Sequence, residues 1–278
     1  MRCRALTPTL LLLCCGSISA TAVDDLAEQG AYLAAAAGCV SCHTDKEQDG
    51  TPFAGGYAME TPYGVFYTPN ITPDPETGIG GWTDEAFVAA VREGIAPDGS
   101  HYYPSFPYPS YAGMTRDDAL AIKAYLDSLE PVNQANRPNA LKWYVPGRNA
   151  MGLWKKLNSP WVYDAAPAGL ERGAYLVRHL GHCGECHTPR GAGGKLKLRR
   201  ELAGSPKTRS SEGAPAIDNS AAGLRDWDIS DIDFFLETGM LPDGDFTGGG
   251  MTAVIEDNTS RLTAADRQAI ARYLKSPN

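Results

Sequence analysis

Two short motifs of the form Cys-x-x-Cys-His are the residues of this sequence best suited to chemistry. They are Cys39-Val-Ser-Cys42-His43 and Cys183-Gly-Glu-Cys186-His187. In this motif the two thiols add across the vinyl groups of a haem, and the histidine coordinates the iron from one side. A haem attached in this way cannot dissociate. The motifs therefore predict two covalently bound haem c groups, with His43 and His187 as iron ligands.

The number and spacing of the cysteines disfavour other uses of these thiols. The chain has seven cysteines, of which Cys3, Cys14 and Cys15 lie in the first fifteen residues, and the other four form the two motifs. A zinc site needs four ligands close together, yet 140 residues separate the two pairs. Disulfides or thioredoxin-like redox pairs do not require a histidine directly after each pair. Haem attachment explains all of these features.

The sixth iron ligand decides whether such a site carries electrons or binds small molecules. A thioether ligand raises the haem potential and suits electron transfer, whereas an open iron allows chemistry. In the second half, Met251 is the expected ligand because it follows three glycines and lies 64 residues after His187. Met240 is the less favoured candidate there, and we expect it to serve in packing.

The sixth ligand of the first iron is less clearly marked. Met114 lies 71 residues after His43 and is the expected ligand. It directly precedes Thr115, however, at the position where the second half has Leu262. Met59, His101 and an open iron remain as alternatives, because the segment corresponding to Met251 contains no methionine.

An internal repeat predicts which elements position the two motifs. Gly-Ala-Tyr-Leu precedes each motif. Downstream of each motif stands a tryptophan, and a glycine follows that tryptophan by twelve residues. Both halves then end in a predicted helix with a threonine N-cap and an acidic residue three positions on, close to a capping box. The matched segments are 30–33 and 173–176, 69–71 and 215–217, 82–94 and 227–239, and 115–126 and 263–274.

This order of elements predicts a mainly α protein with two tandem class I cytochrome c domains. Each domain has a few helices and long loops around a covalent haem, and little in either half alternates like a strand. We expect domain 1 at residues 23–130 and domain 2 at 169–278. A connector at 131–168, rich in proline and aromatic residues, is expected to pack across both domains and fix the distance between the haems.

The N-terminus and the net charge predict an exported, acidic protein. Residues 1–22 have a basic start, an apolar stretch and Ala20-Thr21-Ala22, which together indicate a signal peptide cleaved near Ala22. Removing them leaves 23 basic and 33 acidic residues, a net charge of about −10. Such a chain does not favour nucleic acid. We expect it in the periplasm, held to a membrane only through partners.

The chain also resembles the cytochrome c subunits of membrane-bound bacterial dehydrogenases, such as the alcohol and gluconate dehydrogenases. The resemblance rests on Phe53-Ala-Gly-Gly56, Pro69-Asn-Ile-Thr-Pro-Asp74, Thr77-Gly-Ile-Gly-Gly-Trp82, Tyr103-Pro-Ser-Phe-Pro-Tyr108 and His182-Cys-Gly-Glu-Cys-His-Thr-Pro-Arg190. Those subunits commonly carry three haem domains, whereas this sequence has two attachment motifs. They also often have methionine at the position of Phe106, so Met114 is a substitute for that ligand.

The resemblance implies a non-catalytic electron-transfer subunit. A dehydrogenase catalytic subunit would pass single electrons through the two haems to a downstream cytochrome, a quinone site or a terminal oxidase. One alternative is a haem enzyme in its own right, such as a thiosulfate dehydrogenase or a peroxidase, which requires a displaceable or missing sixth ligand. Another is a free periplasmic electron shuttle. The sequence leaves open the substrate, the potentials and the direction of electron flow.

Overall fold

A computed structural model describes residues 20–158, 162–208 and 213–277. The basic start and apolar stretch of the predicted signal peptide lie outside these residues, as do Cys3, Cys14, Cys15 and Trp161. Ala20-Thr21-Ala22, the predicted cleavage site, forms the beginning of the first helix. Within the described ranges, no helix is both long and apolar enough to cross a membrane.

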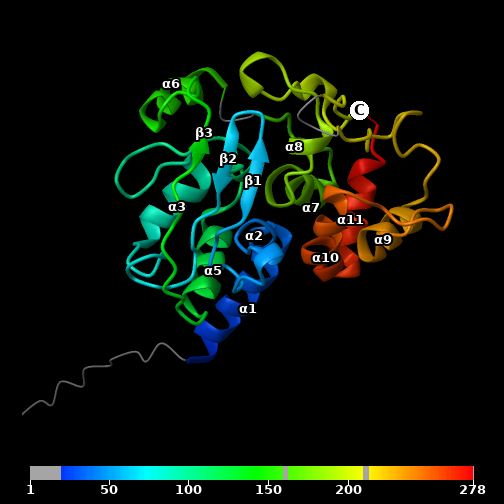
Figure 1. The fold of residues 1–278 in the computed structure, drawn as a ribbon. Helices are drawn as coiled ribbons and strands as arrows, with labels where there is room; N and C mark the ends of the chain where they lie inside the picture. Colours follow the sequence, from blue (N-terminus) through cyan, green and yellow to red (C-terminus); the bar gives the residue numbers. More distant parts are fainter. Residues whose placement is uncertain (1–19, 159–161, 209–212, 278) are drawn as a thin grey trace, which may run out of the picture.

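The protein is mostly helical and consists of two halves with the same order of elements (Figure 1). The first half comprises α1 (Ala20–Ala36), α2 (Cys39–Cys42), α3 (Asp84–Glu93), α4 (Tyr108–Tyr111) and α5 (Arg116–Asp127). The second comprises α7 (Glu171–Tyr175), the π-helix η3 (Leu176–Leu180), α8 (Gly184–His187), α9 (Ile229–Thr238), α10 (Gly250–Asp257) and α11 (Ala264–Leu274).

The closing helices α5 and α11 begin where the capping pattern predicts. The Thr115 hydroxyl accepts a hydrogen bond from the Asp118 amide at 3.0 Å, and the Thr263 hydroxyl accepts one from the Asp266 amide at 3.2 Å. Each cap satisfies an amide that has no partner within the helix. The closing helices pack against the opening helices α1 and α7 of their own halves.

The matched tryptophan and glycine of each half enclose a short helix, α3 in the first half and α9 in the second. The helices end at Gly94 (φ 62°) and Gly239 (φ 76°), whose left-handed conformation favours glycine. Trp82 and Trp227 lie just before these helices, partly buried against the core. The twelve-residue spacing thus reflects one helical unit used twice.

A small antiparallel sheet in the first half was not expected from the sequence. Its strands are β1 (Ala58–Thr61), β2 (Gly64–Tyr67) and β3 (Ala140–Leu141), in the order β1-β2-β3. Each strand has four residues or fewer, too short for a clear alternating pattern. The third strand comes from the connector, so the pairing depends on a contact distant in sequence.

The connector lies mainly against the first half and also contacts the second half, both from α6 (Met151–Asn158) and from Tyr163 and Asp164. From α6, the Lys155 ammonium contacts the Glu93 carbonyl oxygen at 2.5 Å, and the Trp154 indole donates to the Gly193 carbonyl oxygen at 2.7 Å. The connector therefore does contact both halves. However, Trp143 is 95% exposed, so the expectation that its aromatic residues pack between the domains is wrong for this residue.

Candidate haem-binding sites

The two Cys-x-x-Cys-His motifs form one short helical turn each, α2 and α8. A residue with positive φ precedes each motif, Gly38 (φ 68°) in the first half and His182 (φ 38°) in the second. This turn brings the chain from the opening helix into the motif. None of the four motif cysteines is in a disulfide. The structure thus presents both thiol pairs free, on elements that the repeat makes equivalent.

Each motif histidine is fixed in orientation by a proline carbonyl oxygen. His43 Nδ1 lies 2.7 Å from the Pro69 oxygen, and His187 Nδ1 lies 2.8 Å from the Pro215 oxygen. A carbonyl oxygen can only accept, so Nδ1 must carry the proton, which leaves Nε2 with a lone pair for a metal. Burial lowers the pKa of both imidazoles, which favours the neutral form that binds iron.

The motif thiols are not suited to redox exchange. Burial raises the pKa of Cys39 and of Cys183 to about 12. Thiol–disulfide exchange needs a thiolate, and reactive thioredoxin-like pairs achieve it with a lowered pKa. These pairs lack that environment. Cys39, Cys42 and Cys183 are only partly buried and Cys186 is exposed, so the thiols beside each neutral histidine are accessible for covalent attachment instead.

A second repeated feature around each histidine was missed by the sequence analysis. Thr44 and Thr188 directly follow the motif histidines, and their hydroxyls accept hydrogen bonds from the amides of Phe53 at 3.2 Å and Leu202 at 3.0 Å. Both acceptor loops turn through a left-handed residue that is not glycine, since φ is 63° at Phe53 and 62° at Leu202. Such strained positions cluster at functional sites.

The same loops also hold the histidine backbone. The Gly55 amide donates to the His43 carbonyl oxygen at 2.9 Å, and the Gly204 amide donates to the His187 carbonyl oxygen at 2.8 Å. The signal that could have revealed this is the match between 53–55 (Phe-Ala-Gly) and 202–204 (Leu-Ala-Gly). It is short, and only the structure shows that each triplet contacts a motif.

The two methionines expected as sixth ligands occupy different surroundings. Met114 is 1% exposed and packs in the core at the entry to α5. Leu262, its counterpart in the second half, is also buried there. Met251 is partly buried at the start of α10, which follows the glycine run. Met240 pairs with Phe246 in an isolated β-bridge beside α9.

The other candidates in the first half have different partners. Met59 lies in β1, opposite Phe66 of β2. His101 Nδ1 lies 2.9 Å from the Lys155 ammonium of the connector, and its ring packs against Gly152. His101 is therefore already contacted from α6.

Arg148 of the connector provides a test of whether this region fits a haem. Its Nε donates to the His101 carbonyl oxygen at 2.9 Å, and its guanidinium lies 4.9 Å from the centre of the Tyr102 ring. Its Nη2 is buried and has no hydrogen-bond partner among the described residues. A buried guanidinium nitrogen requires an acceptor, and a haem propionate is an acceptor of the right charge.

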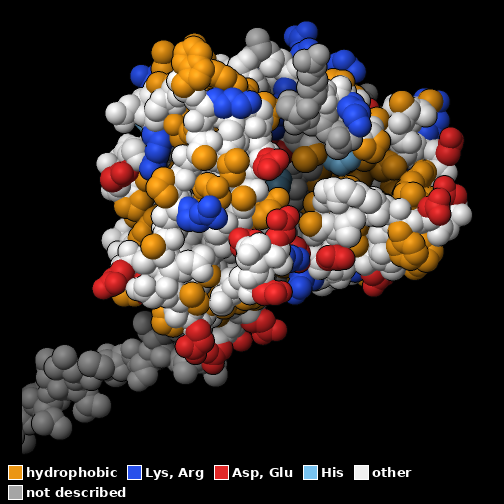
Figure 2. Space-filling view, in the orientation of Figure 1, with side chains coloured by type: hydrophobic (Ala, Val, Ile, Leu, Met, Phe, Trp, Pro, Cys, Tyr) orange, Lys and Arg blue, Asp and Glu red, His pale blue; other side chains and the backbone are white. Residues whose placement is uncertain are grey.

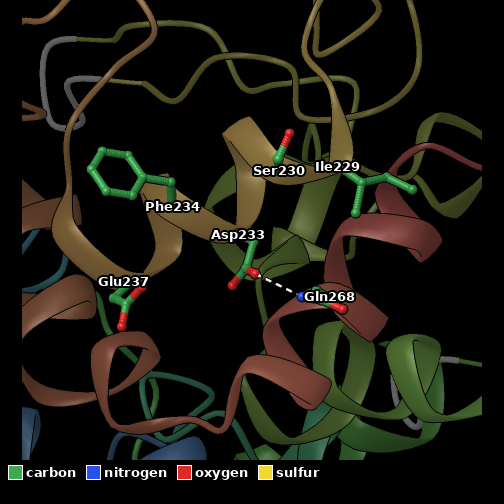
Figure 3. A pocket seen from close by; sticks show the side chains of 6 residues that line it. All are labelled: Ile229, Ser230, Asp233, Phe234, Glu237 and Gln268. Atoms are coloured by element: carbon green, nitrogen blue, oxygen red, sulfur yellow. Dashed lines mark hydrogen bonds between the residues drawn. The ribbon is translucent and has the colours of Figure 1, made fainter.

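Histidine side chains are visible on the molecular surface, and the structure also has a pocket elsewhere. On the face seen in Figure 2, histidine side chains lie within a hollow between the two halves. A separate pocket of about 410 Å³ opens between α9 and α11 and is lined by Ile229, Ser230, Asp233, Phe234, Glu237 and Gln268 (Figure 3). No motif residue and no candidate iron ligand lines this pocket. We therefore assign the chemistry to the motifs and not to the pocket.

Comparison with known proteins agrees with the duplicated architecture. The family model for cytochrome c matches residues 27–130 and again residues 170–277. The chain belongs to the cytochrome c family. The predicted fold class, mainly α with two tandem cytochrome c domains, is confirmed by this double match and by the helical structure.

Three relatives illustrate the range of similar cytochrome c proteins. A dihaem cytochrome c-type protein of Cereibacter sphaeroides is 44% identical over 256 residues, covering 90% of this chain and 85% of the relative. The gluconate 2-dehydrogenase cytochrome c subunit of Pantoea cypripedii is 40% identical over 290 residues, covering 96% and 64%. The quinone alcohol dehydrogenase cytochrome c subunit of Gluconacetobacter polyoxogenes is 41% identical over 266 residues, covering 90% and 56%. The chain thus spans less than two thirds of the two dehydrogenase subunits.

Proposed function

We propose that this cytochrome c is a periplasmic dihaem electron carrier that serves as the electron-transfer subunit of a dehydrogenase. One observation carries the proposal. Each half has a free pair of thiols next to a histidine whose Nδ1 is bound to a proline carbonyl oxygen, at 2.7 Å in one half and 2.8 Å in the other. In each half this arrangement leaves the histidine Nε2 with a lone pair that can bind iron. Haem c supplies the one-electron redox couple at each site.

The residues of the chain then have defined roles. Cys39, Cys42, Cys183 and Cys186 attach the two haems, and His43 and His187 are the fifth ligands. Met114 and Met251 are the sixth ligands, since Met114 is the buried candidate of the first domain and Met251 directly follows the glycine run of the second. Arg148 is expected to pair with a propionate of the first haem.

The partners follow from the relatives. Several are, by name, cytochrome subunits of alcohol, gluconate and fructose dehydrogenases, and one is a nicotinate dehydrogenase subunit. We infer that a catalytic subunit of this kind donates electrons here, and that a cytochrome, a quinone site or an oxidase of the respiratory chain accepts them. The acidic surface suits docking to basic partners.

Isolation from the native host under mild conditions tests this role. A dehydrogenase subunit that co-purifies in stoichiometric amount, identified by mass spectrometry, is the expected result. A solitary dihaem protein whose first iron binds carbon monoxide would instead indicate a haem enzyme, and one that binds none would indicate a free shuttle.

The haem sites themselves are tested by substitution in each motif. Replacing both cysteines of one motif, as in Cys39→Ala/Cys42→Ala, should lower the intact mass by one haem and leave the other attached. The matched variant Cys183→Ala/Cys186→Ala should do the same for the second haem. Two haems retained in either variant would contradict the assignment.

A further inference from the structure

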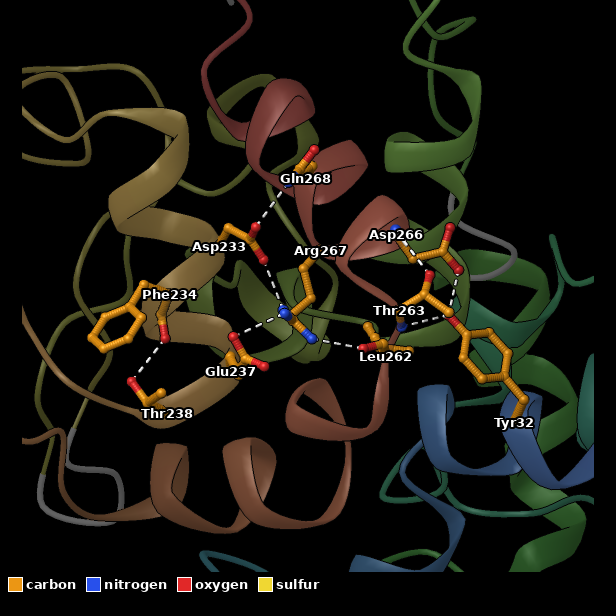
Figure 4. Close-up of polar contacts among 10 residues, drawn as sticks. All are labelled: Tyr32, Asp233, Phe234, Glu237, Thr238, Leu262, Thr263, Asp266, Arg267 and Gln268. Carbon is orange, nitrogen blue, oxygen red and sulfur yellow. Dashed lines mark hydrogen bonds and ion pairs between the residues drawn. The ribbon is translucent and has the colours of Figure 1, made fainter.

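The two cytochrome c domains contact each other through equivalent residues that are exchanged across their interface. The Tyr32 hydroxyl of α1 donates to Asp266 Oδ2 of α11 at 2.6 Å, as Figure 4 shows. In the opposite direction, the Tyr175 hydroxyl of α7 donates to Asp118 Oδ2 of α5 at 2.5 Å. The tyrosines occupy the same place in the repeat, and so do the aspartates. Each domain therefore gives its tyrosine to the aspartate of the other.

Each tyrosine oxygen also accepts a hydrogen bond from the cap of the same helix. The Thr263 amide donates to the Tyr32 oxygen at 3.3 Å, and the Thr115 amide donates to the Tyr175 oxygen at 3.1 Å. Each hydroxyl thus binds one amide and one carboxylate at the N-terminus of the partner helix. We call this pair of tyrosine contacts the reciprocal clasp.

A second exchanged pair lies beside the haem-attachment motifs. The Ser41 hydroxyl donates to Asn258 Oδ1 at 3.0 Å, and the Ser110 hydroxyl donates to Glu185 Oε1 at 3.1 Å. Ser41 and Glu185 both stand third in their motifs, and Ser110 and Asn258 both lie five residues before the threonine cap. Exchange of equivalent residues is the mark of a two-fold interface, so the two domains are related by a pseudo-two-fold axis.

The same interface brings the two haem sites together. The first motif, α2, contacts α10, which begins beside Met251. In the other direction, η3, which leads into the second motif, contacts α4, just before Met114. The chain at or just before each motif thus contacts a helix at or just before the expected sixth ligand of the other domain.

We propose that Tyr32 and Tyr175 are positioning residues that hold the two haem-bearing domains at one distance and angle, so that an electron crosses directly between the two sites. The proposal rests on the proposed dihaem electron transfer. The step moves one electron from the reduced site to the oxidised site and needs no proton or further reactant. Its rate falls exponentially with the separation of the sites, so a loosened interface slows it.

The test removes both hydroxyls from the full, haem-loaded chain as Tyr32→Phe/Tyr175→Phe. Tyr103→Phe is the matched control, because that hydroxyl donates to the Pro146 carbonyl oxygen at 2.9 Å, away from the interface. Two quantities are measured. Pulsed electron paramagnetic resonance reports the dipolar coupling between the two irons, and flash reduction reports the rate of electron transfer within the chain.

Loss of a hydrogen bond to a carboxylate shifts the balance between closed and open arrangements by about tenfold. We expect the double variant to broaden the distribution of the dipolar coupling between the two irons. We also expect it to lower the rate of electron transfer between the two haems by about tenfold or more. The optical spectrum and potential of each haem should stay unchanged, which a general loss of structure would not allow. Coupling and rate equal to those of Tyr103→Phe would overturn the proposal.

A second variant keeps the test decisive if the first does not fold. Tyr32→Phe/Asp118→Ala breaks the same two contacts, the second of them by removing the carboxylate of Asp118 in place of the Tyr175 hydroxyl, and should spread the range of inter-iron distances in the same way. Failure of the proposed function is separately visible. If the chain carries two coupled haems but has no dehydrogenase partner, the proposed role fails and this test can still be made. If the chain carries one haem, the unmodified protein shows no coupling between irons, and the dihaem assignment itself fails.

Discussion

Gly30 of α1 lies directly against the carbonyl oxygen of Ala121 in α5, and a Cβ atom added to it would come within 1.9 Å of that oxygen. Gly173 of α7 has the same relationship to Ala269 in α11, at 2.1 Å. In both domains the opening and closing helices can cross this closely only because the residue has no side chain. The crossings support the haem motifs, because each opening helix leads into one.

Substitution of Gly30 by alanine should therefore destabilise the first domain. Overpacking of a tight contact costs about 1–3 kcal/mol, and a contact this short should lie at the upper end of that range. Thermal unfolding followed by circular dichroism measures the loss. Gly147→Ala is the control, because Gly147 has φ −63° and no heavy atom within 4 Å of an added Cβ. Equal melting temperatures for the two variants would contradict the packing described.

The sixth ligands can be tested separately for each haem. Met114→Leu and Met251→Leu should each remove about half of the thioether-to-iron charge-transfer absorption and lower the potential of one haem, because a methionine ligand raises it. Redox titration with optical detection measures both effects. Met240→Leu and Met59→Leu serve as controls and should leave the spectrum unchanged. An unchanged spectrum in Met114→Leu would return Met59, His101 or an open iron as the first-site assignment, and the Met59→Leu spectrum would separate the first of these from the others.

Arg267 should contribute strongly to the stability of the second domain. It is 6% exposed, and it contacts Asp233 at 2.7 Å, Glu237 at 3.0 Å and the Leu262 carbonyl oxygen at 2.7 Å (Figure 4). Arg267→Met removes the partner of Asp233 Oδ1, whose side chain is 17% exposed, and of the carbonyl oxygen of the buried Leu262, which costs about 3–5 kcal/mol. Denaturant titration measures this loss.

The matched control for Arg267 is an exposed ion pair of the first domain. Arg116 pairs with Glu85 at 3.2 Å, with side chains 51% and 78% exposed. Arg116→Met should cost less than about 1 kcal/mol, as exposed pairs do. Comparable losses in the two arginine variants would show that burial is not the source of the effect.

Asp266 should make the stability of the second domain, and its contact with Tyr32 of the first, sensitive to acid. Hydrogen bonds from Arg172, at 2.8 and 2.6 Å, hold the pKa of this carboxyl below its ordinary value of 3.8, with a further contribution from Tyr32. The unfolded chain takes up this proton first as the pH falls. The stabilisation is therefore complete above about pH 4 and is lost as the pH falls through the lowered pKa.

Denaturant unfolding at about pH 6 and about pH 3 measures this dependence. The Asp266→Asn variant should be less stable at the higher pH and should lose less stability on acidification than the unmodified chain. A pH dependence identical in both proteins would show that another carboxyl is responsible.

The repeated helices were predictable because their signals are local. Thr115 and Thr263 mark the starts of the closing helices, and Gly94 and Gly239 mark the ends of the short ones. Each signal acts within about four residues of the element it bounds. His43 and His187 as fifth ligands were likewise inferred from one contiguous motif, and this assignment stays a prediction.

The features that escaped prediction depend on contacts distant in sequence. The hairpin of β1 and β2 is completed by β3, since Gly64 pairs with Leu141. The exposure of Trp143 could not be read from composition, which shows only that aromatic residues are frequent in the connector. The repeat revealed Tyr32 and Tyr175 as equivalent, but a repeat does not show that each residue binds the other copy.

The reciprocal clasp also suggests how the chain arose. Two identical single-haem proteins that form a symmetric dimer would make the same contact twice, once in each direction. Gene duplication followed by fusion would preserve such a pair of contacts within one chain. In such a pair any substitution alters both ends of the contact at once, whereas in a fused chain each end can change alone. The tyrosine–aspartate contacts have remained alike, while Ser41 with Asn258 and Ser110 with Glu185 have diverged in residue type. Because both copies lie in one chain, they can differ in residue type and properties and still stay together.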